Sequence, residues 1–201
     1  MVLTFPLEIR IADATDAQRI AILHATSWRL SYRGMLSDTY LDGVLINERT
    51  HLWVERLTTP QRKLRVVLAE VGDRLAGFAC AFGSQDLRFG TLLDNLHVSS
   101  DFQQQGIGTR LMREIVTWCQ AELPGEGLFL WVLEANARAR YFYEQLDGTQ
   151  VTEKLWQAPD GSEAPRVCYA WNDLVVLKQE LTSRHHLLRE IRTLANEKLN
   201  R

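Results

Sequence analysis

The sequence predicts an α/β layered domain of the α+β kind, with one mixed, mostly antiparallel central sheet flanked by helices. Two observations support this prediction. Short segments with alternating apolar residues, typical of strands, are interspersed along the chain with segments whose apolar residues recur at helical spacing. The 201 residues are 46% hydrophobic with a formal net charge of -2, which is enough for one globular domain with a sizeable core.

The first part of the chain is expected to form two helices and three strands. The predicted strands are Leu7 to Ile11, Leu64 to Glu70 and Leu75 to Phe82, the last two joined by a tight turn. A helix capped by Asp13 or Thr15 is predicted to run to about Trp28, and a second helix to span Ser37 to Leu57. The segment Gly83 to Gly90 is predicted to be a polar loop.

The stretch Thr91 to Cys119 predicts a strand, a glycine-containing loop and a helix. Gly106 and Gly108 fall in the first helical turn, where each costs roughly 1 kcal/mol against Ala. Without a Cβ, they let a ligand's phosphates approach amides that lack intrahelical partners. Leu111 stands where a dinucleotide fingerprint needs its third glycine, and no P-loop lysine follows. An ordinary tight turn is the alternative.

The remainder of the chain completes the sheet and adds an extension. Strands are predicted at Leu128 to Leu133, Thr149 to Gln157 and Arg166 to Trp171, and a helix at Asn136 to Leu146. We therefore expect one domain over residues 1–171 and a C-terminal helical extension over residues 172–201. The apolar residues of the extension have heptad-like spacing: Leu174, Leu177, Leu181, Leu188, Ile191 and Ala195. They must pack on this domain or on a second copy, and a homodimer is slightly favoured.

Two separate motifs are similar to those of one known superfamily. Leu96-His97-Val98 precedes Gln103-x-x-Gly106-x-Gly108, and further on Asn136, Ala139, Phe142, Tyr143 and Glu144 fall in register with Asn-x-x-Ala-x-x-Phe-Tyr-Glu-x-x-Gly. Asp147 stands where the second pattern has its glycine, and Gly148 follows one place later. The chain resembles the Gcn5-related N-acetyltransferase (GNAT) superfamily over roughly Leu7 to Trp171, which implies the acyl-CoA N-acyltransferase fold.

The resemblance implies acetyl-CoA as cosubstrate and no metal. It assigns coenzyme binding to the end of the central strand, the loop and the helix start, with the thioester beside Leu96 to Val98 where this strand parts from its neighbour. The implied coenzyme-binding residues are Leu96, His97, Val98, Gln103, Gln104, Gln105, Gly106, Gly108, Thr109 and Asn136. Tyr143 matches the general acid for the departing thiolate, although it could also only pack. Asn136 could equally be only a helix cap.

The acceptor side is predicted with alternatives. Strand alternation places Asp94 on the face of Leu96 and Val98, where it would act as a general base or bind a cationic acceptor. His97 points to the opposite face and is more typical of a packed sheet histidine than of a base. Trp28 and Tyr32 either plug the underside of the sheet or line the acceptor pocket, as the matching connection does in the superfamily.

These observations favour an acetyl-CoA-dependent N-acetyltransferase that transfers an acetyl group directly to a primary amine of a small molecule or protein. A non-catalytic acyl-CoA sensor with the same fold is the alternative. A pI of about 6.2 argues against nucleic acid as the main partner. The chain has neither an apolar run of membrane-spanning length nor an N-terminal signal segment, so a cytoplasmic protein is expected. Its three cysteines read as buried hydrophobes.

Overall fold

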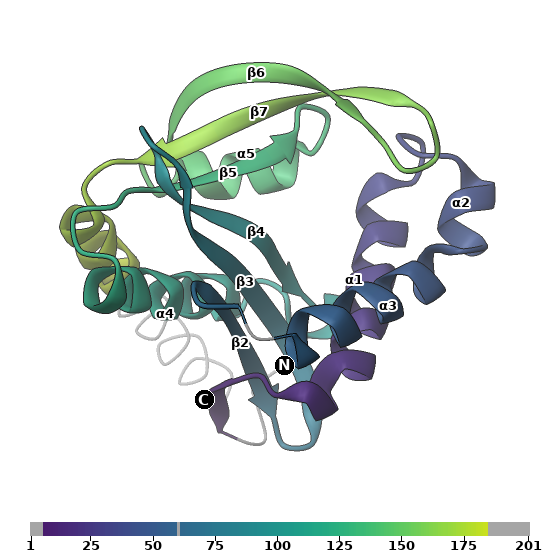
Figure 1. Ribbon diagram of the computed structural model, residues 1–201, viewed down its shortest axis with the longest axis horizontal. Coiled ribbons are helices and arrows are strands. Elements are labelled where there is room, and N and C mark those ends of the chain that lie inside the picture. Colours follow the sequence, from purple (N-terminus) through teal and green to yellow (C-terminus); the bar gives the residue numbers. More distant parts are fainter. Residues whose placement is uncertain (1–5, 60, 185–201) are drawn as a thin grey trace, which may run out of the picture.

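The computed structural model describes residues 6–59 and 61–184. In this part of the chain a seven-stranded sheet has the order β1-β2-β3-β4-β5-β7-β6, with β4 and β5 parallel and all other neighbours antiparallel (Figure 1). The strands are β1 (Leu7–Ile11), β2 (Leu64–Val71), β3 (Arg74–Asp86), β4 (Gly90–Val98), β5 (Leu128–Leu133), β6 (Thr149–Gln157) and β7 (Glu163–Trp171). The predicted mixed, mostly antiparallel sheet is confirmed.

Helices cover both faces of this sheet. On one side lie α1 (Ala17–Tyr32), α2 (Asp38–Asp42) and α3 (Leu45–Thr58), and on the other lies α4 (Ile107–Glu122) (Figure 1). The short helix α5 (Ala137–Glu144) packs against β5 and β7, and residues 174–184 are helical. Within the described residues, no helix is both long and apolar enough to cross a membrane.

Three predicted element boundaries were wrong. Helix α1 continues to Tyr32, so the connector expected to begin at Trp28 is mostly helical. The helix predicted over Ser37 to Leu57 is two helices separated at Gly43, where a Cβ would lie 2.5 Å from the carbonyl oxygen of Thr39. The polar loop predicted at Gly83 to Gly90 is instead largely the end of a hairpin, because β3 extends to Asp86 and β4 begins at Gly90.

Strands β4 and β5 pair over a very short length. Thr91 pairs with Leu128 and Leu92 with Phe129, and no further pairs follow toward Val98. The β5 strand instead continues along β7 as far as Leu133. The two parallel strands therefore diverge at the part of β4 that contains Leu96 to Val98, as the sequence resemblance implied.

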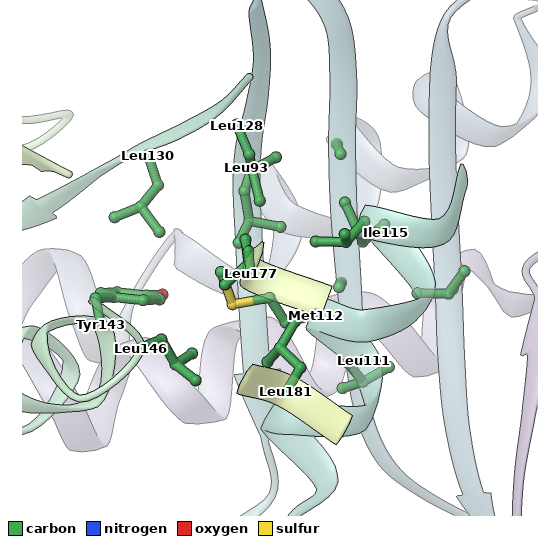
Figure 2. Packing of buried hydrophobic residues seen from close by; sticks show 14 of the residues in the cluster. Leu93, Leu111, Met112, Ile115, Leu128, Leu130, Tyr143, Leu146, Leu177 and Leu181 are labelled. Atoms are coloured by element: carbon green, nitrogen blue, oxygen red, sulfur yellow. The ribbon is translucent and has the colours of Figure 1, made fainter. Parts of the chain in front are cut away.

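The main hydrophobic core lies between the sheet and α4, and the C-terminal segment belongs to it. Leu174, Leu177 and Leu181 are at most 6% exposed and share one cluster with Met112 of α4. Figure 2 shows Leu177 and Leu181 beside Met112 and Leu111. The described half of the predicted apolar stripe therefore packs on its own domain, whereas Leu188, Ile191 and Ala195 lie outside the described residues. All three cysteines are buried free thiols, as predicted.

A buried carboxylate ties β1 to the start of the first helices. Asp16 is 2% exposed, and its two oxygens each accept a hydrogen bond from the Arg10 guanidinium at 2.7 Å. Hydrogen bonding from Arg10 lowers the pKa of Asp16 below its ordinary value, and the Asp13 backbone N–H adds to this effect. Because the folded pKa lies below the unfolded one, the stabilisation is present above the unfolded pKa of about 4 and is lost as the pH falls through the folded pKa.

We therefore expect the unfolding free energy of the wild-type protein to fall as the pH is lowered from 5 toward 3. In Asp16→Asn, the protein should lose about 1–3 kcal/mol at pH 7, because charge-assisted hydrogen bonds are removed, and its remaining pH dependence should be shallower. Urea unfolding at a series of pH values measures both. Parallel pH curves for the two proteins would contradict the assigned role of Asp16.

Candidate active site

A cavity of about 690 Å³ lies where β4 and β5 diverge. Its walls come from α1, the second half of β4, the loop that enters α4, the middle of β5, and α5. Most residues predicted for the site line it: Tyr32, Asp94, Leu96, His97, Val98, Gln103, Gln104, Gly106, Gly108, Thr109, Asn136 and Tyr143. The structure thus brings two motifs some 40 residues apart in sequence into one site.

The start of α4 forms the anion-binding end of this cavity. Gly106 caps the helix with φ +77°, a left-handed conformation that glycine adopts at low cost, and its carbonyl accepts the first helical bond from Arg110 N. The first-turn amides that follow Gly106 have no intrahelical acceptor. Gly108 adds no side chain in front of them. These amides and the positive end of the helix dipole suit the phosphates of a nucleotide-like ligand.

The three consecutive glutamines of the loop have different roles. Gln103 Nε2 donates to the Val98 carbonyl at 3.2 Å, and its Oε1 accepts from Arg138 Nη1 at 2.6 Å. This side chain therefore links β4, the loop and α5 at the cavity wall. Gln104 lines the cavity with φ +59°. Gln105 does not line it, because its side chain turns back and donates to the Asp101 carbonyl at 3.3 Å.

The second motif supplies the opposite wall. Asn136 Oδ1 accepts a hydrogen bond from Ala139 N at 3.2 Å, so it does cap α5, and it lines the cavity as well. Asp147 adopts φ +56° at the position where the superfamily has glycine. Gly148 must be a glycine for a different reason, because a Cβ at this position would lie 2.7 Å from the Trp171 ring. The shifted glycine is thus explained by packing on β7.

Tyr143 is a buried phenol on the cavity wall. It is 8% exposed and packs against the rings of Tyr169 and Trp171, and Figure 2 shows its ring reaching from α5 toward the core cluster. No hydrogen bond of its hydroxyl occurs within the described residues. Burial, together with the neighbouring Tyr32 phenol, raises the pKa of Tyr143 well above its usual value, so the group stays protonated at neutral pH. Burial likewise raises the pKa of Tyr32 to about 12.

Asp94 lies at a β-bulge, which overturns the predicted side-chain alternation. Leu93 pairs with Ala81 and Asn95 with Cys80, so Asp94 is one extra residue in β4. Leu96 and Val98 pack toward the α4 side, whereas Asp94 Oδ2 accepts from Arg56 Nη1 of α3 at 2.7 Å on the opposite side. The prediction that Asp94 shares a face with Leu96 and Val98 was wrong for this reason. Its carboxylate still lines the cavity, but as half of an ion pair.

His97 points toward α1, opposite to Leu96 and Val98 as predicted, and it lines the cavity. Its Nδ1 is 2.8 Å from Ser27 Oγ. The ring packs against His24, with centroids 4.8 Å apart, and against Phe78 at 5.2 Å. Burial, with a smaller effect of Arg49, lowers the pKa of His97 to about 4, so the imidazole is neutral at pH 7.

The two aromatic residues predicted for the acceptor side have separate places. Tyr32 lines the cavity, whereas Trp28 does not and is only 9% exposed. The Trp28 ring lies between those of Tyr32 and Trp156 of β6, and Arg49 covers it at 4.5 Å. Trp28 is thus a core residue that holds α1 against β6.

Sequence reasoning missed several lining residues, among them Ser27, Ser31, Trp131, Arg138 and Arg184. Ser27 and Ser31 are one helical turn apart on α1, beside Tyr32, and this polar spacing could have indicated a helix face on a cavity. Trp131 had no such signal, because it sits within a wholly apolar strand.

The fold and the arrangement of the cavity agree with what the sequence resemblance implies, and comparison with known proteins identifies the family. The acetyltransferase (GNAT) family model matches residues 27–148. A probable N-acetyltransferase of Mycobacterium tuberculosis is 31% identical over 172 residues, covering 81% of this chain and 92% of the relative. YuaI, an uncharacterized N-acetyltransferase of Bacillus subtilis, is 27% identical, covering 85% of this chain and 95% of the relative.

Solved structures share the fold at low sequence identity. The PaiA N-acetyltransferase of Thermoplasma acidophilum, in complex with coenzyme A, has a TM-score of 0.63 at 19% identity, covering 81% of this chain and 98% of the other. A Gcn5-related N-acetyltransferase from Rhodopseudomonas palustris has a TM-score of 0.64 at 15% identity, with 86% and 99% covered. The chain belongs to the GNAT acetyltransferase family and is an N-acetyltransferase.

Proposed function

We propose that the protein transfers an acetyl group from acetyl-CoA directly to a primary amine of a small molecule or protein. The observation that carries this proposal is one continuous cavity that runs from the start of α4, past the divergence of β4 and β5, to the polar wall of α1. A pyrophosphate needs the first of these features, an extended thioester arm the second, and an amine the third.

The residues present fit the coenzyme. Gln104, Gly106, Gly108 and Thr109 would hold its phosphates through backbone amides, with Arg138 adding positive charge nearby. Asn136, whose amide nitrogen remains available after capping, would bind the pantetheine arm. Leu96, His97 and Val98 would place the thioester where the β5-facing edge of β4 is unpaired and its backbone can donate hydrogen bonds, while the other edge stays paired with β3. The coenzyme supplies an activated acetyl group.

Tyr143 would donate a hydrogen bond, and then a proton, to the sulfur as it leaves. Its raised pKa keeps the donor proton in place at neutral pH, and its hydroxyl has no competing protein acceptor within the described residues. Asp94, held by Arg56 through Oδ2, has no hydrogen-bond partner for Oδ1 among the described residues and would accept a hydrogen bond there from the acceptor amine. Among the described residues that line the cavity, Asp94 is the carboxylate, and it is already paired with Arg56. The lining therefore does not specifically favour a strongly cationic acceptor.

A screen of amines in the presence of acetyl-CoA tests this function. Thermal-shift measurements first identify amines that raise the melting temperature of the coenzyme complex, and mass spectrometry then looks for the N-acetylated product. Product that forms only with enzyme and amine together supports the proposal. Stabilisation by acetyl-CoA, with no acetylated product from any amine class, would instead support the acyl-CoA sensor.

A further inference from the structure

The acceptor nitrogen must lose a proton when it is acetylated, and one side chain is placed to take it. This inference rests on the proposed function and deepens it. Asp94, which the sequence analysis considered as a general base, is already held in an ion pair. Arg56 Nη1 donates to it at 2.7 Å and to the neighbouring Asn95 Oδ1 at 3.0 Å. This arrangement fixes the carboxylate in an ion pair at the bulge and leaves it one oxygen for binding.

His97 is located at the reacting segment itself. It lies on β4 between Leu96 and Val98, which would hold the thioester, and its side chain lies on the α1 side of the strand. Both His97 and its hydrogen-bond partner Ser27 line the same cavity. An amine that approaches the thioester from the α1 side would therefore meet the imidazole before any other group that is neutral and basic.

A second histidine, His24, packs against the His97 ring. Trp53 Nε1 donates to His24 Nδ1 at 3.0 Å, so the hydrogen of neutral His24 resides on Nε2, which is buried and has no partner among the described residues. His97 is in contact with His24 of α1 and feels the charge of Arg49 of α3, whereas Arg56 of α3 acts on His24 and pairs with Asp94 of β4. Burial, with a smaller effect of Arg49, keeps both imidazoles neutral, and both rings pack against Phe78.

We propose that His97 is the general base that takes the proton from the acceptor amine, with Ser27 as a positioning residue that accepts a hydrogen bond from His97 Nδ1–H. In this tautomer Nε2 carries a free lone pair. The amine nitrogen forms a bond to the acetyl carbonyl carbon, and its proton passes to Nε2 directly or through one water. The carbon–sulfur bond breaks, and the sulfur takes the Tyr143 proton. Solvent then removes the proton from His97 and restores that of Tyr143.

The kinetic test compares His97→Gln with Asp94→Asn, using an amine that the wild-type enzyme acetylates. We expect kcat of His97→Gln to fall about 10²–10⁴-fold, with the acetyl-CoA Kd within about twofold, as expected for loss of a base alone. Asp94→Asn should mainly raise the acceptor KM. Ser27→Ala should lower kcat and Ser27→Thr should restore it. Wild-type kcat for His97→Gln, or a larger kcat loss for Asp94→Asn, would overturn the proposal.

A structural test needs no turnover. Nitrogen-15 NMR of the imidazole should show His97 with a hydrogen on Nδ1 and a bare Nε2 at pH 7, and with protonation only near pH 4. A hydrogen on Nε2 at pH 7 would overturn the proposal. If the wild-type protein acetylates no amine, the proposed function fails, and the NMR result still decides separately whether His97 presents a base to the cavity.

Discussion

Replacement of Tyr143 by phenylalanine is expected to lower kcat about 10²–10⁴-fold, because the departing thiolate loses its proton donor. The ring remains, so its packing against Tyr169 and Trp171 is kept. No hydrogen bond of the phenol within the described residues is lost, so stability should change little. Steady-state kinetics gives kcat, and isothermal titration with acetyl-CoA should give an unchanged Kd.

Tyr169→Phe provides the matched control for the same aromatic cluster. The Tyr169 hydroxyl donates to Glu144 and accepts from Arg140, and it does not line the cavity. Its loss should cost about 1 kcal/mol of stability and leave kcat near the wild-type value. A Tyr143→Phe enzyme with kcat within twofold of wild type would remove Tyr143 from the chemistry and leave it a packing residue.

The second large effect is expected at Gly108, where coenzyme affinity and fold stability should move in opposite directions. A Cβ at this position would meet Phe142 at 3.6 Å and Val98 at 3.9 Å, both ordinary contacts, so alanine should fit the fold. Alanine should also favour the helix by up to about 1 kcal/mol. The added methyl would nevertheless stand on the cavity wall at the start of α4. We expect the acetyl-CoA Kd to rise about tenfold or more, which corresponds to roughly 1.4 kcal/mol.

Isothermal titration and urea unfolding measure the two effects on one Gly108→Ala sample. Gln105→Ala is the control within the same loop, because the Gln105 side chain faces the Asp101 carbonyl and lies off the cavity. Its acetyl-CoA Kd should stay within about twofold of wild type. Equal losses of affinity in both variants would mean that loop order, and not access to the α4 amides, controls binding.

The sequence predicted the strands well, and most of the residues it proposed for coenzyme binding line one cavity, because short-range patterns determine both. Alternation marked the strands, and Gly106 with Gly108 marked a helix start that has room for phosphates. The second motif predicted that Asn136 and Tyr143 would lie on the same site, and the cavity contains both. These features depend on local conformation and on residue spacing, and both can be recognised directly in the sequence.

The acceptor end was predicted less well, because its geometry depends on contacts between distant residues. One extra residue in β4 at Asp94 changes which side chains face α1, and a strand pattern does not reveal a bulge. The partner of Asp94 is Arg56, 38 positions earlier on α3, and the partner of His97 is Ser27, 70 positions earlier.

The measurement that tests direct acetyl transfer to an amine most directly is single-turnover release of free coenzyme A, with enzyme in excess over acetyl-CoA. The expected result is negligible thiol release until the amine is added, followed by release matched one to one by N-acetylated amine, because no step uses an acetylated side chain. A burst of thiol before any amine is present would indicate an acetyl-enzyme and contradict direct transfer. Absence of release with every amine that stabilises the coenzyme complex would contradict the assignment of acetyl-transfer chemistry to this cavity.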